Sequence, residues 1–385
     1  MLREDFHRQL NAPLLFTPGP TPTPEFLRDA LARPTIHHRT KEFEAIFAEV
    51  RESLSFMMGL PEVLLLASSG TGAMEASLSN LARRKILSIN SGKFGERFGG
   101  IGRGLGLEVV EIKNEWDTPV SLDQVERVMA KEGDIDCICM QICESSGGLA
   151  HPYKEIFAFI KEKYAGVMTI ADGITALGVE MIDTSNIDAL IGGSQKAFML
   201  PPGLAFVGLS HEALALIESG ANAKGRGYYF DLGRELKNQS KNTTAYTPAT
   251  TIITGLKAYF DWLDSIGLSV EGLYSHTERL AKATRKACNA IGLKVYPKVP
   301  SNSMTVLESK HSKDLIGCLK EDFGIMVADG QDHLKGKILR INHMGYVPWL
   351  DCCFVVTALE LGLQSLGLRR FDSTANRIFC EDFLF

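Results

Sequence analysis

An aspartate and a lysine that each follow an apolar run have the chemistry of a carbonyl-reactive site. Asp172 ends the run VMTIAD (167–172), and Lys196 comes soon after the run IDALIGG (187–193), among small and apolar residues. Burial lowers the pKa of a lysine and so favours attack of its amine on a carbonyl carbon. A carboxylate at a strand end either holds a cationic ring nitrogen or caps the following turn. The pair indicates covalent amine chemistry; the plainer alternatives are a turn cap and a lysine whose tip reaches solvent.

Two further features indicate binding sites for anions. The segment SSGTGAME (68–75) stands between a predicted strand and a predicted helix. Its glycines let backbone N–H groups close on an anion, and a helix N-terminus favours negative charge, although a plain strand–turn–helix connection has a similar sequence. Arg340 lies in the run KILRINHMG (337–345). Its guanidinium is a natural bidentate partner for a carboxylate, although structural arginines on strands are common.

The elements that must position these residues have the pattern of a helix-covered parallel sheet. Short apolar runs alternate with segments of helical spacing, and several runs are continuously apolar, as strands are when both sheet faces are covered. The carboxyl ends of such strands form the edge where α/β folds bind ligands. The seven predicted strands span residues 62–68, 85–90, 108–114, 135–142, 167–172, 187–193 and 204–210.

The pattern divides the chain into three parts. Residues 1–30 form an N-terminal arm that is too rich in proline for regular structure and is expected to lie across another surface. Residues 31–260 form the large α/β domain. Residues 261–385 contain the end of a stretch of long helices and then strands that alternate with helices at 313–322 and 350–366, which predicts a small α+β domain.

Composition excludes several other classes of protein. The chain has 385 residues with 41 basic and 46 acidic side chains, a formal charge of −5, which argues against nucleic acid as a partner. No apolar run approaches the ~18 residues of a membrane span, and the N-terminus lacks the features of a signal peptide, so we expect a cytoplasmic protein. Cys137, Cys139 and Cys143 lack the usual ligand spacings, so we expect no metal and interpret them as one face of a buried strand.

Taken together, these features resemble the class V, fold-type I aminotransferases that use pyridoxal 5′-phosphate, in particular the alanine–glyoxylate and serine–pyruvate branch. The resemblance implies a large, mostly parallel seven-stranded sheet domain and a small C-terminal α+β domain. It covers nearly the whole chain and rests on TPGPTPTP (17–24), HHRTKEF (37–43), SSGTGAMEA (68–76), NSGKFGERF (90–98), CESSGG (143–148), ADGITALG (171–178), GSQKAFMLPPGLAF (193–206), AYTPAT (245–250) and ILRINHMG (338–345).

The resemblance implies a role for each matched residue. Lys196 is the lysine that binds the cofactor as a Schiff base and moves the proton, and Asp172 pairs with the pyridine nitrogen. Arg340 binds the substrate α-carboxylate, near Gly19. The implied cofactor contacts are Phe94 and Ile174 on the two ring faces, Ser146 at the phenolic oxygen, Gly70, Thr71, Gly72 and Gln195 at the phosphate, and Thr244, Tyr246 and Thr247 reaching that phosphate from the partner subunit of a homodimer.

The implied reaction moves an amino group from L-serine or L-alanine to glyoxylate or pyruvate, by ping-pong kinetics through pyridoxamine phosphate. Three alternatives remain. His38 and Arg39 resemble a substrate-phosphate site, which would suit phosphoserine or another acidic or phosphonate donor. Cys318 is a candidate nucleophile for a cysteine desulfurase-like lyase. Some relatives of this branch have been labelled hydrogenase-associated subunits, which would make the chain a non-catalytic scaffold.

Overall fold

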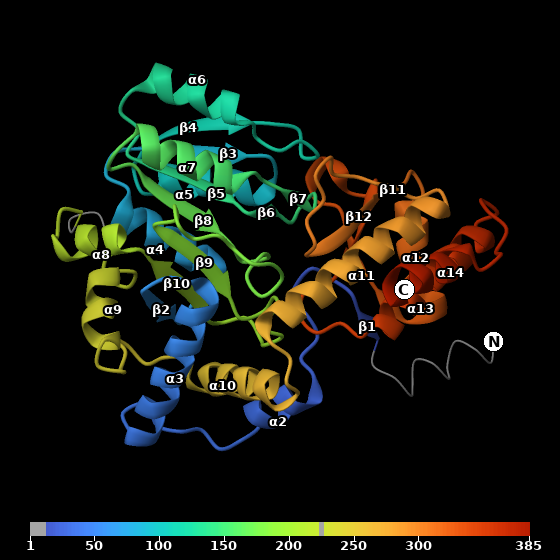
Figure 1. Cartoon of the computed structure of the whole chain (residues 1–385), viewed down its shortest axis with the longest axis horizontal. Coiled ribbons are helices and arrows are strands. Elements are labelled where there is room, and N and C mark those ends of the chain that lie inside the picture. Colours follow the sequence, from blue (N-terminus) through green and yellow to red (C-terminus); the bar gives the residue numbers. More distant parts are fainter. Residues whose placement is uncertain (1–12, 223–226) are drawn as a thin grey trace.

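Seven strands form the central sheet of the larger lobe in the computed structural model, which describes residues 13–222 and 227–385 (Figure 1). Their spatial order is β2-β10-β9-β8-β5-β3-β4. This confirms the predicted seven-stranded sheet, and each observed strand falls inside its predicted run. The bounds are β2 Glu62–Leu66, β3 Lys85–Asn90, β4 Glu108–Lys113, β5 Cys137–Gln141, β8 Met168–Asp172, β9 Ala189–Gly193 and β10 Ala205–Leu209.

The sheet is mostly parallel because only β10 runs against its neighbours. β3, β4, β5, β8 and β9 pair in parallel, while β10 pairs antiparallel with both β9 and β2. The register places Asp172, at the end of β8, opposite Gln141 on one side and Ile191 on the other. The carboxyl ends of β5, β8 and β9 therefore meet at one edge of the sheet.

Helices bury both faces of this sheet, as the continuously apolar strands predict. One core contains side chains of α3 (Lys41–Met58), α6 (Leu122–Glu132), α7 (Tyr153–Lys163) and α10 (Thr250–Ser265). The other contains side chains of α4 (Gly70–Leu81), α5 (Lys93–Gly104), α8 (His211–Glu218) and α9 (Leu232–Gln239). Helices α4 and α5 both begin at the edge where β8 and β9 end, so their N-termini face the predicted site.

The structure corrects the interpretation of three cysteines as one strand face. Cys137 and Cys139 do lie on β5 and pack in one core. Cys143, however, belongs to a separate two-residue strand, β6 (Cys143–Glu144), which pairs with β7 (Leu149–Ala150) and packs at the junction of the lobes. The chain turns after Gln141 because the sheet ends there, and the period-2 pattern does not reveal this turn.

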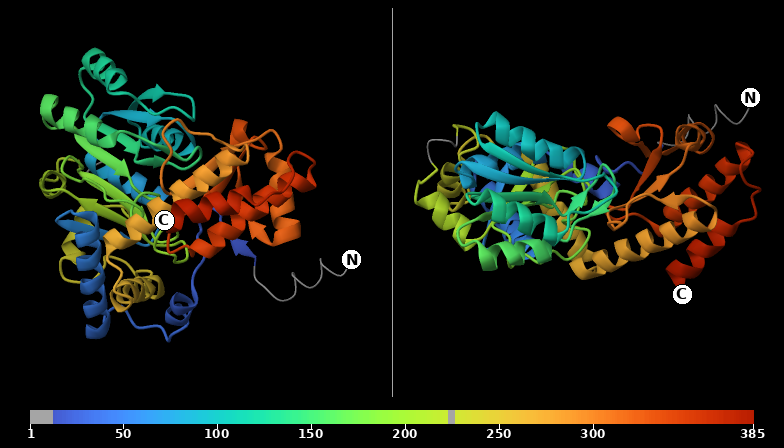
Figure 2. Two further views of the ribbon diagram at one scale, coloured as in Figure 1. Left: turned by 45° about the vertical axis from the view of Figure 1, so that its right-hand side comes forward. Right: turned by 90° about the horizontal axis from the view of Figure 1, so that it is seen from above.

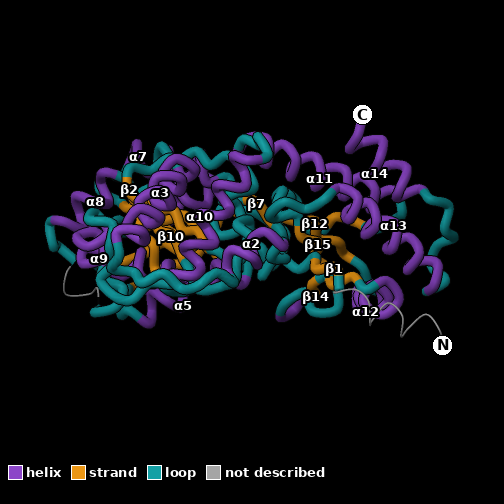
Figure 3. Tube along the Cα trace, turned by 90° about the horizontal axis from the view of Figure 1, so that it is seen from below, coloured by secondary structure: helices purple, strands orange, loops and turns teal. Residues whose placement is uncertain are grey.

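The smaller lobe is a four-stranded antiparallel sheet packed against helices. Its strand order is β11-β12-β15-β14, and its core is separate from those of the large sheet. The long helix α11 runs from the large lobe along the small one, and helices lie beside the strands in both lobes (Figures 2 and 3). The bounds are α11 Val270–Ala290, β11 Lys294–Val295, β12 Met304–Glu308, α12 Ser312–Phe323, β13 Ile325–Met326, β14 Ala328–Asp329, η2 Asp332–Leu334, β15 Ile338–Asn342, α13 Trp349–Ser365 and α14 Thr374–Leu384.

The N-terminal arm has regular structure, contrary to the prediction. Its first twelve residues lie outside the described residues. Beyond them, β1 (Leu14–Leu15) pairs with β13 of the small lobe, and α2 (Glu25–Leu31) packs on α10 of the large lobe. Prolines permit this helix because Pro24 stands at its N-cap, where a missing N–H costs nothing. The arm thus spans both lobes. Among the described residues, no helix is long and apolar enough to cross a membrane.

Candidate active site

Lys196 lies in the turn after β9, and the N-terminal arm packs on its side chain. Its Nζ donates a hydrogen bond to the carbonyl oxygen of Pro18. Gly19 has φ +101°, and a Cβ at that position would overlap the end of the lysine side chain. Burial lowers the pKa of Lys196 to about 8, with Arg340 and Arg97 adding repulsion and Asp172 opposing them. The sequence pattern predicted this desolvated amine, and the structure also places Gly19 beside it.

Asp172 is buried at the end of β8. Its Oδ1 accepts a hydrogen bond from the backbone N–H of Ile174 at 2.9 Å, so it does cap the next turn. Burial nevertheless raises its pKa to about 7, assisted by repulsion from Glu144 and opposed by the Ile174 bond, Lys196 and Arg97. The cap and the ring-nitrogen role are therefore compatible, because one carboxylate oxygen makes no hydrogen bond within the described part of the chain.

The predicted anion loop forms the N-terminus of α4. Gly70, Thr71 and Gly72 lie in its first turn, and a Cβ on Gly70 would overlap the side chain of Ile174. Ile174 therefore lies directly against this loop. On α5, Arg97 donates from Nη1 to Thr71 Oγ1 at 2.8 Å, and its guanidinium lies 4.6 Å from the centroid of the Phe94 ring. The structure thus brings Gly70, Thr71, Ile174 and Phe94 together.

Glu144 organises the start of α5 from a fully buried position. Its Oε2 accepts from the backbone N–H groups of Phe94 and Gly95 at 3.0 and 2.9 Å. Its Oε1 accepts from the backbone and hydroxyl of Ser146 at 3.0 and 2.6 Å. The Ser146 hydroxyl also accepts from the Lys93 N–H at 3.1 Å. Its proton is therefore committed to Glu144, so its predicted contact with the cofactor's phenolic oxygen requires Ser146 Oγ to act as an acceptor.

Arg340, on β15, is held by carbonyl groups rather than by an acid. Its Nε and Nη2 donate to the Asp329 carbonyl at 3.0 and 2.8 Å, and its Nη1 donates to the Ser145 carbonyl at 3.1 Å. Within residues 13–222 and 227–385 it makes no ion pair. Three of its five N–H groups are used, and the others remain for a carboxylate. The Ser145 contact ties this arginine of the small lobe to the edge of the large sheet.

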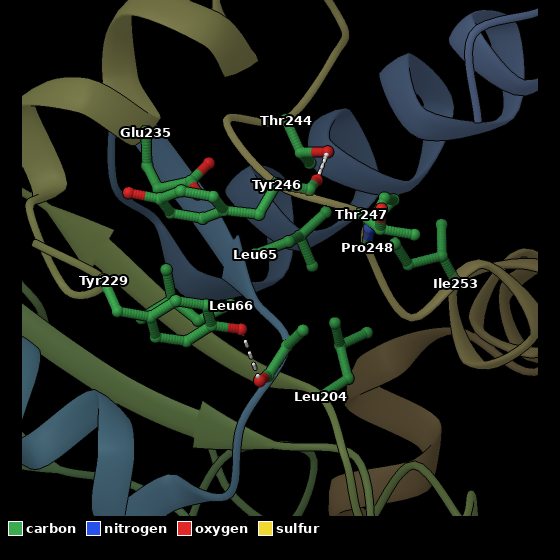
Figure 4. A pocket seen from close by; sticks show the side chains of 11 residues that line it. Leu65, Leu66, Leu204, Tyr229, Glu235, Thr244, Tyr246, Thr247, Pro248 and Ile253 are labelled. Atoms are coloured by element: carbon green, nitrogen blue, oxygen red, sulfur yellow. Dashed lines mark hydrogen bonds between the residues drawn. The ribbon is translucent and has the colours of Figure 1, made fainter.

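Thr244, Tyr246 and Thr247 line a small pocket beside the end of β2 (Figure 4). Tyr246 stacks on Tyr229 at 5.1 Å, and the Tyr229 hydroxyl donates to the Ala67 carbonyl at 3.2 Å. The pocket has a volume of about 20 Å³, room for about one water molecule, so it is not a cofactor site. No hydrogen bond joins these residues to Lys196 or Asp172 in the described chain, and their predicted contact with a cofactor phosphate stays a prediction.

No hydrogen bond joins His38 or Arg39 to Lys196 within the described residues. They precede α3, where Arg39 is exposed and its backbone N–H donates to His37 Nδ1 at 3.3 Å. Burial and the neighbouring charges of His37 and Arg39 lower the pKa of His38. Their predicted contact with a substrate stays a prediction.

Three residues at this edge were missed by the sequence reading: Arg97, Glu144 and Gln141. Gln141 is fully buried opposite Asp172, and among the described residues neither its amide nitrogen nor its amide oxygen has a hydrogen-bond partner. The sequence signal for Arg97 and Glu144 was their presence in the GKFGERF and CESSGG runs. Gln141 had no such signal, because it stands in the run predicted to be a strand and matches no motif of its own.

Cys318 does not have the environment of a catalytic thiol. It lies on α12, and its thiol donates to Asp322 Oδ2 at 3.1 Å. Burial, together with that hydrogen bond and charge, raises its pKa to about 12. A nucleophilic cysteine needs the opposite shift. No group of three or more acidic, histidine or cysteine side chains suited to a metal occurs among the residues with a described placement.

Comparison with known proteins agrees with the resemblance to the class V aminotransferases. Residues 22–345 match the family model described as aminotransferase class V. An uncharacterized aminotransferase of Helicobacter pylori is 48% identical over 96% of this chain and 99% of its own. The soluble hydrogenase 42 kDa subunit of Anabaena cylindrica is 34% identical over 94% and 96% of the two chains. The serine–glyoxylate aminotransferase of Methylorubrum extorquens is 28% identical over 92% of each.

A solved structure has the same fold over nearly its whole length. The aspartate aminotransferase of subgroup IV from Thermus thermophilus superposes with a TM-score of 0.81 at 30% identity, covering 91% of this chain and 99% of that one.

Proposed function

Because the chain belongs to the class V aminotransferases, we propose that it moves an amino group from L-serine or L-alanine to glyoxylate or pyruvate. The observation that carries the proposal is the meeting of three groups at one edge of the sheet. These are the desolvated amine of Lys196, the carboxylate of Asp172 and the guanidinium of Arg340, which has no acidic partner in the described chain. The name of the serine–glyoxylate relative supports this choice of substrates.

The residues at this edge fit pyridoxal phosphate. The first turn of α4 offers backbone N–H groups to a phosphate, and the side-chain amide of Gln195, next to Lys196 in the chain, has an NH₂ group that can donate to the same anion. Gly19 and Gly70 leave room where a side chain would clash with Lys196 or Ile174. When bound, the cofactor supplies an aldehyde that condenses with amines and a protonated ring that withdraws electrons from the substrate α-carbon.

Lys196 is the residue proposed to move the proton. Because burial lowers its pKa to about 8, a useful fraction of its Nζ is unprotonated near neutral pH and can accept a proton from the α-carbon of the donor. The Pro18 carbonyl accepts a hydrogen bond from Nζ and so restricts its position. Asp172 would hold the ring nitrogen of the cofactor through its free carboxylate oxygen and favour the protonated form of that nitrogen.

Arg340 is proposed to orient both substrates through their shared carboxylate. Its free N–H groups bind the α-carboxylate of the amino donor and then that of the 2-oxo acid, so one residue serves both half-reactions. The backbone at Pro18 and Gly19 forms the facing wall. The two half-reactions use one site in turn, which gives ping-pong kinetics.

We further propose a homodimer in which Thr244, Tyr246 and Thr247 of one subunit complete the phosphate site of the other. They make no hydrogen bond to Lys196 or Asp172 within the described chain, which is consistent with this arrangement. An acidic donor, such as aspartate or phosphoserine, is the second candidate. The uncommitted guanidinium of Arg39 favours it, since that exposed cation would add a site for a second negative charge across such an interface.

A donor panel separates these candidates. Cofactor-loaded protein is mixed in a stopped-flow instrument with L-serine, L-alanine, L-aspartate or O-phospho-L-serine, and loss of the visible cofactor band is followed. We expect serine and alanine to react fastest. A faster reaction with aspartate or phosphoserine that is lost in Arg39→Ala would establish the acidic-donor reading. Absence of reaction with every donor, together with copurification of a hydrogenase, would favour the scaffold alternative.

A further inference from the structure

Arg97 lies between two predicted cofactor contacts, Thr71 and Phe94, and the proposed mechanism gives it no role. It projects from the second turn of α5 toward the start of α4. Its Nη1 donates to Thr71 Oγ1 at 2.8 Å, and its guanidinium lies over the Phe94 ring at 4.6 Å from the centroid. Thr71 is a proposed phosphate contact and Phe94 a proposed ring contact, so the guanidinium lies where the two parts of the cofactor would join.

The charge of Arg97 has no acidic partner in residues 13–222 and 227–385. The other cations of α5 do have partners: Lys93 pairs with Asp332 at 2.9 Å, and Arg103 pairs with Glu111 at 2.6 Å. Within the described residues, only one of the five guanidinium N–H groups of Arg97 makes a hydrogen bond, so several donors are free. The field of this charge reaches the site. Burial dominates the pKa values of Asp172 and Lys196, and Arg97 lowers both.

The N-terminus of α4 lacks acceptors for its first backbone N–H groups within the described residues, and an anion would supply them. Ser69 makes no side-chain capping bond and the first turn contains no acidic residue, whereas α3, α6 and α9 have capping side chains. The backbone N–H groups of Gly70 and Thr71 have no acceptor in the described chain. A helix N-terminus carries about +0.5 charge, while a phosphate monoester carries about −1.5 to −2 at neutral pH. The helix alone therefore leaves most of the phosphate charge unbalanced.

We propose that Arg97 is a phosphate-binding residue of this chain, which supplies the fixed positive charge opposite the first turn of α4. Thr71 then holds the guanidinium through its hydroxyl while its backbone N–H faces the same anion, and Phe94 supports the guanidinium from the side. This inference rests on the proposed function, since it requires the cofactor beside Lys196. It predicts that Arg97 contributes to affinity for the phosphate and not to affinity for the pyridine ring.

The test compares two ligands that differ only in the phosphate, pyridoxamine phosphate and pyridoxamine. Neither forms a bond to lysine, and equilibrium dialysis with cofactor-free protein gives both dissociation constants. We expect Arg97→Gln to raise the dissociation constant of pyridoxamine phosphate about 10- to 100-fold and that of pyridoxamine less than about twofold. The substitution removes only the charge-assisted contact with the phosphate, which pyridoxamine lacks. Arg103→Gln is the matched control on the same helix and should bind both ligands like the wild type.

Arg97→Lys provides a second variant in case the glutamine variant does not fold. It keeps a positive charge but loses the planar fork, so we expect a smaller loss that is again confined to the phosphorylated ligand. An equal loss for both ligands would assign Arg97 to the ring through Phe94, and unchanged binding of both would remove it from the site. Either result overturns the inference. Wild-type protein that binds neither ligand would instead overturn the proposed function.

Discussion

Burial acts on Lys196 and Asp172 in opposite directions, because lysine is charged when protonated and aspartate when deprotonated. With a pKa of about 8, about a tenth of Lys196 amines are unprotonated at pH 7, against about one in 2,500 for an ordinary lysine. The same burial leaves Asp172 with a pKa of about 7 in the cofactor-free chain. A cationic ring nitrogen beside Asp172 would restore its charge, so each residue has a protonation state suited to its proposed partner.

The raised pKa of Asp172 predicts a specific dependence of stability on pH. Folding raises this pKa from 3.8 to about 7, so between these values the folded chain holds more protons than the unfolded one. Stability must then fall as pH rises through this window. From pH 5 to pH 8, we expect cofactor-free wild type to lose about 2–3 kcal/mol relative to Asp172→Asn, measured from urea unfolding of both proteins. A difference that stays constant with pH would contradict the assigned environment.

The unpaired guanidinium of Arg340 predicts an equal effect on both substrates. Replacing Arg340 with glutamine removes a charge-assisted bond to the α-carboxylate, so kcat/KM should fall about 10- to 100-fold for the amino donor and for the 2-oxo acid. The steady-state rates for each substrate provide the measurement. Arg127→Gln, at an exposed position on α6, is the matched control. A loss confined to one substrate would show that Arg340 does not bind the shared group.

At the residue scale, sequence identified the groups that stand directly after strands, because their position implies the edge of the sheet. Lys196 and Asp172 were predicted in this way. Arg97 and Gln141 were not. Their significance depends on what lies across the edge, namely Thr71 for Arg97 and Asp172 for Gln141. Such contacts join segments far apart in the chain, and single-residue patterns contain no information about them.

The start of α5 shows how one element is fixed in place by groups outside it. Glu144 accepts the first free N–H groups of the helix, and a Cβ on Gly95 would overlap the backbone of Ile89 and Asn90 on β3. The Ser88 hydroxyl donates to the Gly95 carbonyl at 3.2 Å. These contacts hold α5 close to the sheet edge and so set the positions of Phe94 and Arg97.

We therefore expect Glu144→Gln to destabilise the protein by about 2–4 kcal/mol, because a buried acceptor oxygen is replaced by an amide that faces N–H donors. Urea unfolding of the cofactor-free protein gives this value. Glu155→Gln, on the exposed side of α7, controls for the loss of charge. If the two variants have the same stability, Glu144 does not hold the helix.

Elements with a clear periodicity of apolar residues were predictable from sequence, and elements that depend on pairing with a distant strand were not. The seven strands of the large sheet all fall within their predicted runs, and helices occupy the segments of helical spacing between them, since their apolar residues face a core on one or both sides. In contrast, β1 and β6 are two residues long and exist only because β13 and β7 pair with them. Helix α2 was missed because the prolines around it are breakers inside a helix but not at its start.

The N-terminal arm connects the small lobe to the large lobe and passes the site on the way. It begins on the small lobe at β1, passes Lys196 at Pro18 and Gly19, and ends on the large lobe at α2. Arg340 joins the lobes from the other direction through the Ser145 carbonyl. The division of the chain into arm, large domain and small domain remains our proposal. Leu263, in α10, packs in the core of the large sheet.

A proposed dimer with shared sites predicts complementation between inactive variants. Lys196→Ala lacks the amine, and Tyr246→Ala lacks a contact supplied to the partner. In a mixed dimer, one site contains both wild-type residues, so random mixing should restore about a quarter of wild-type activity. The variants are unfolded and refolded together, with each refolded alone as the control. No recovery in the mixture would show that each chain builds its site by itself.

Sequence alone did not place Thr244, Tyr246, His38 and Arg39 relative to Lys196, and none of the four makes a hydrogen bond to it within the described chain. Their predicted roles came from resemblance, and we propose that a second copy of the chain brings them to the site. The presence of two lobes was predictable, since the regular alternation of strands and helices in the large domain gives way, after the long helices, to the pattern of a small α+β domain. The path of the arm between them was not, because it depends on the shape of both lobes.

The most direct test of the account is to find which side chain binds the cofactor covalently. Cofactor-loaded protein is reduced with borohydride, digested and analysed by mass spectrometry, with Lys196→Ala treated in parallel. We predict that the reduced cofactor is attached to Lys196 in the wild type and to no residue in the variant. A reduced cofactor on another lysine, or equal labelling of the variant, would contradict the assignment of this edge of the sheet as the active site.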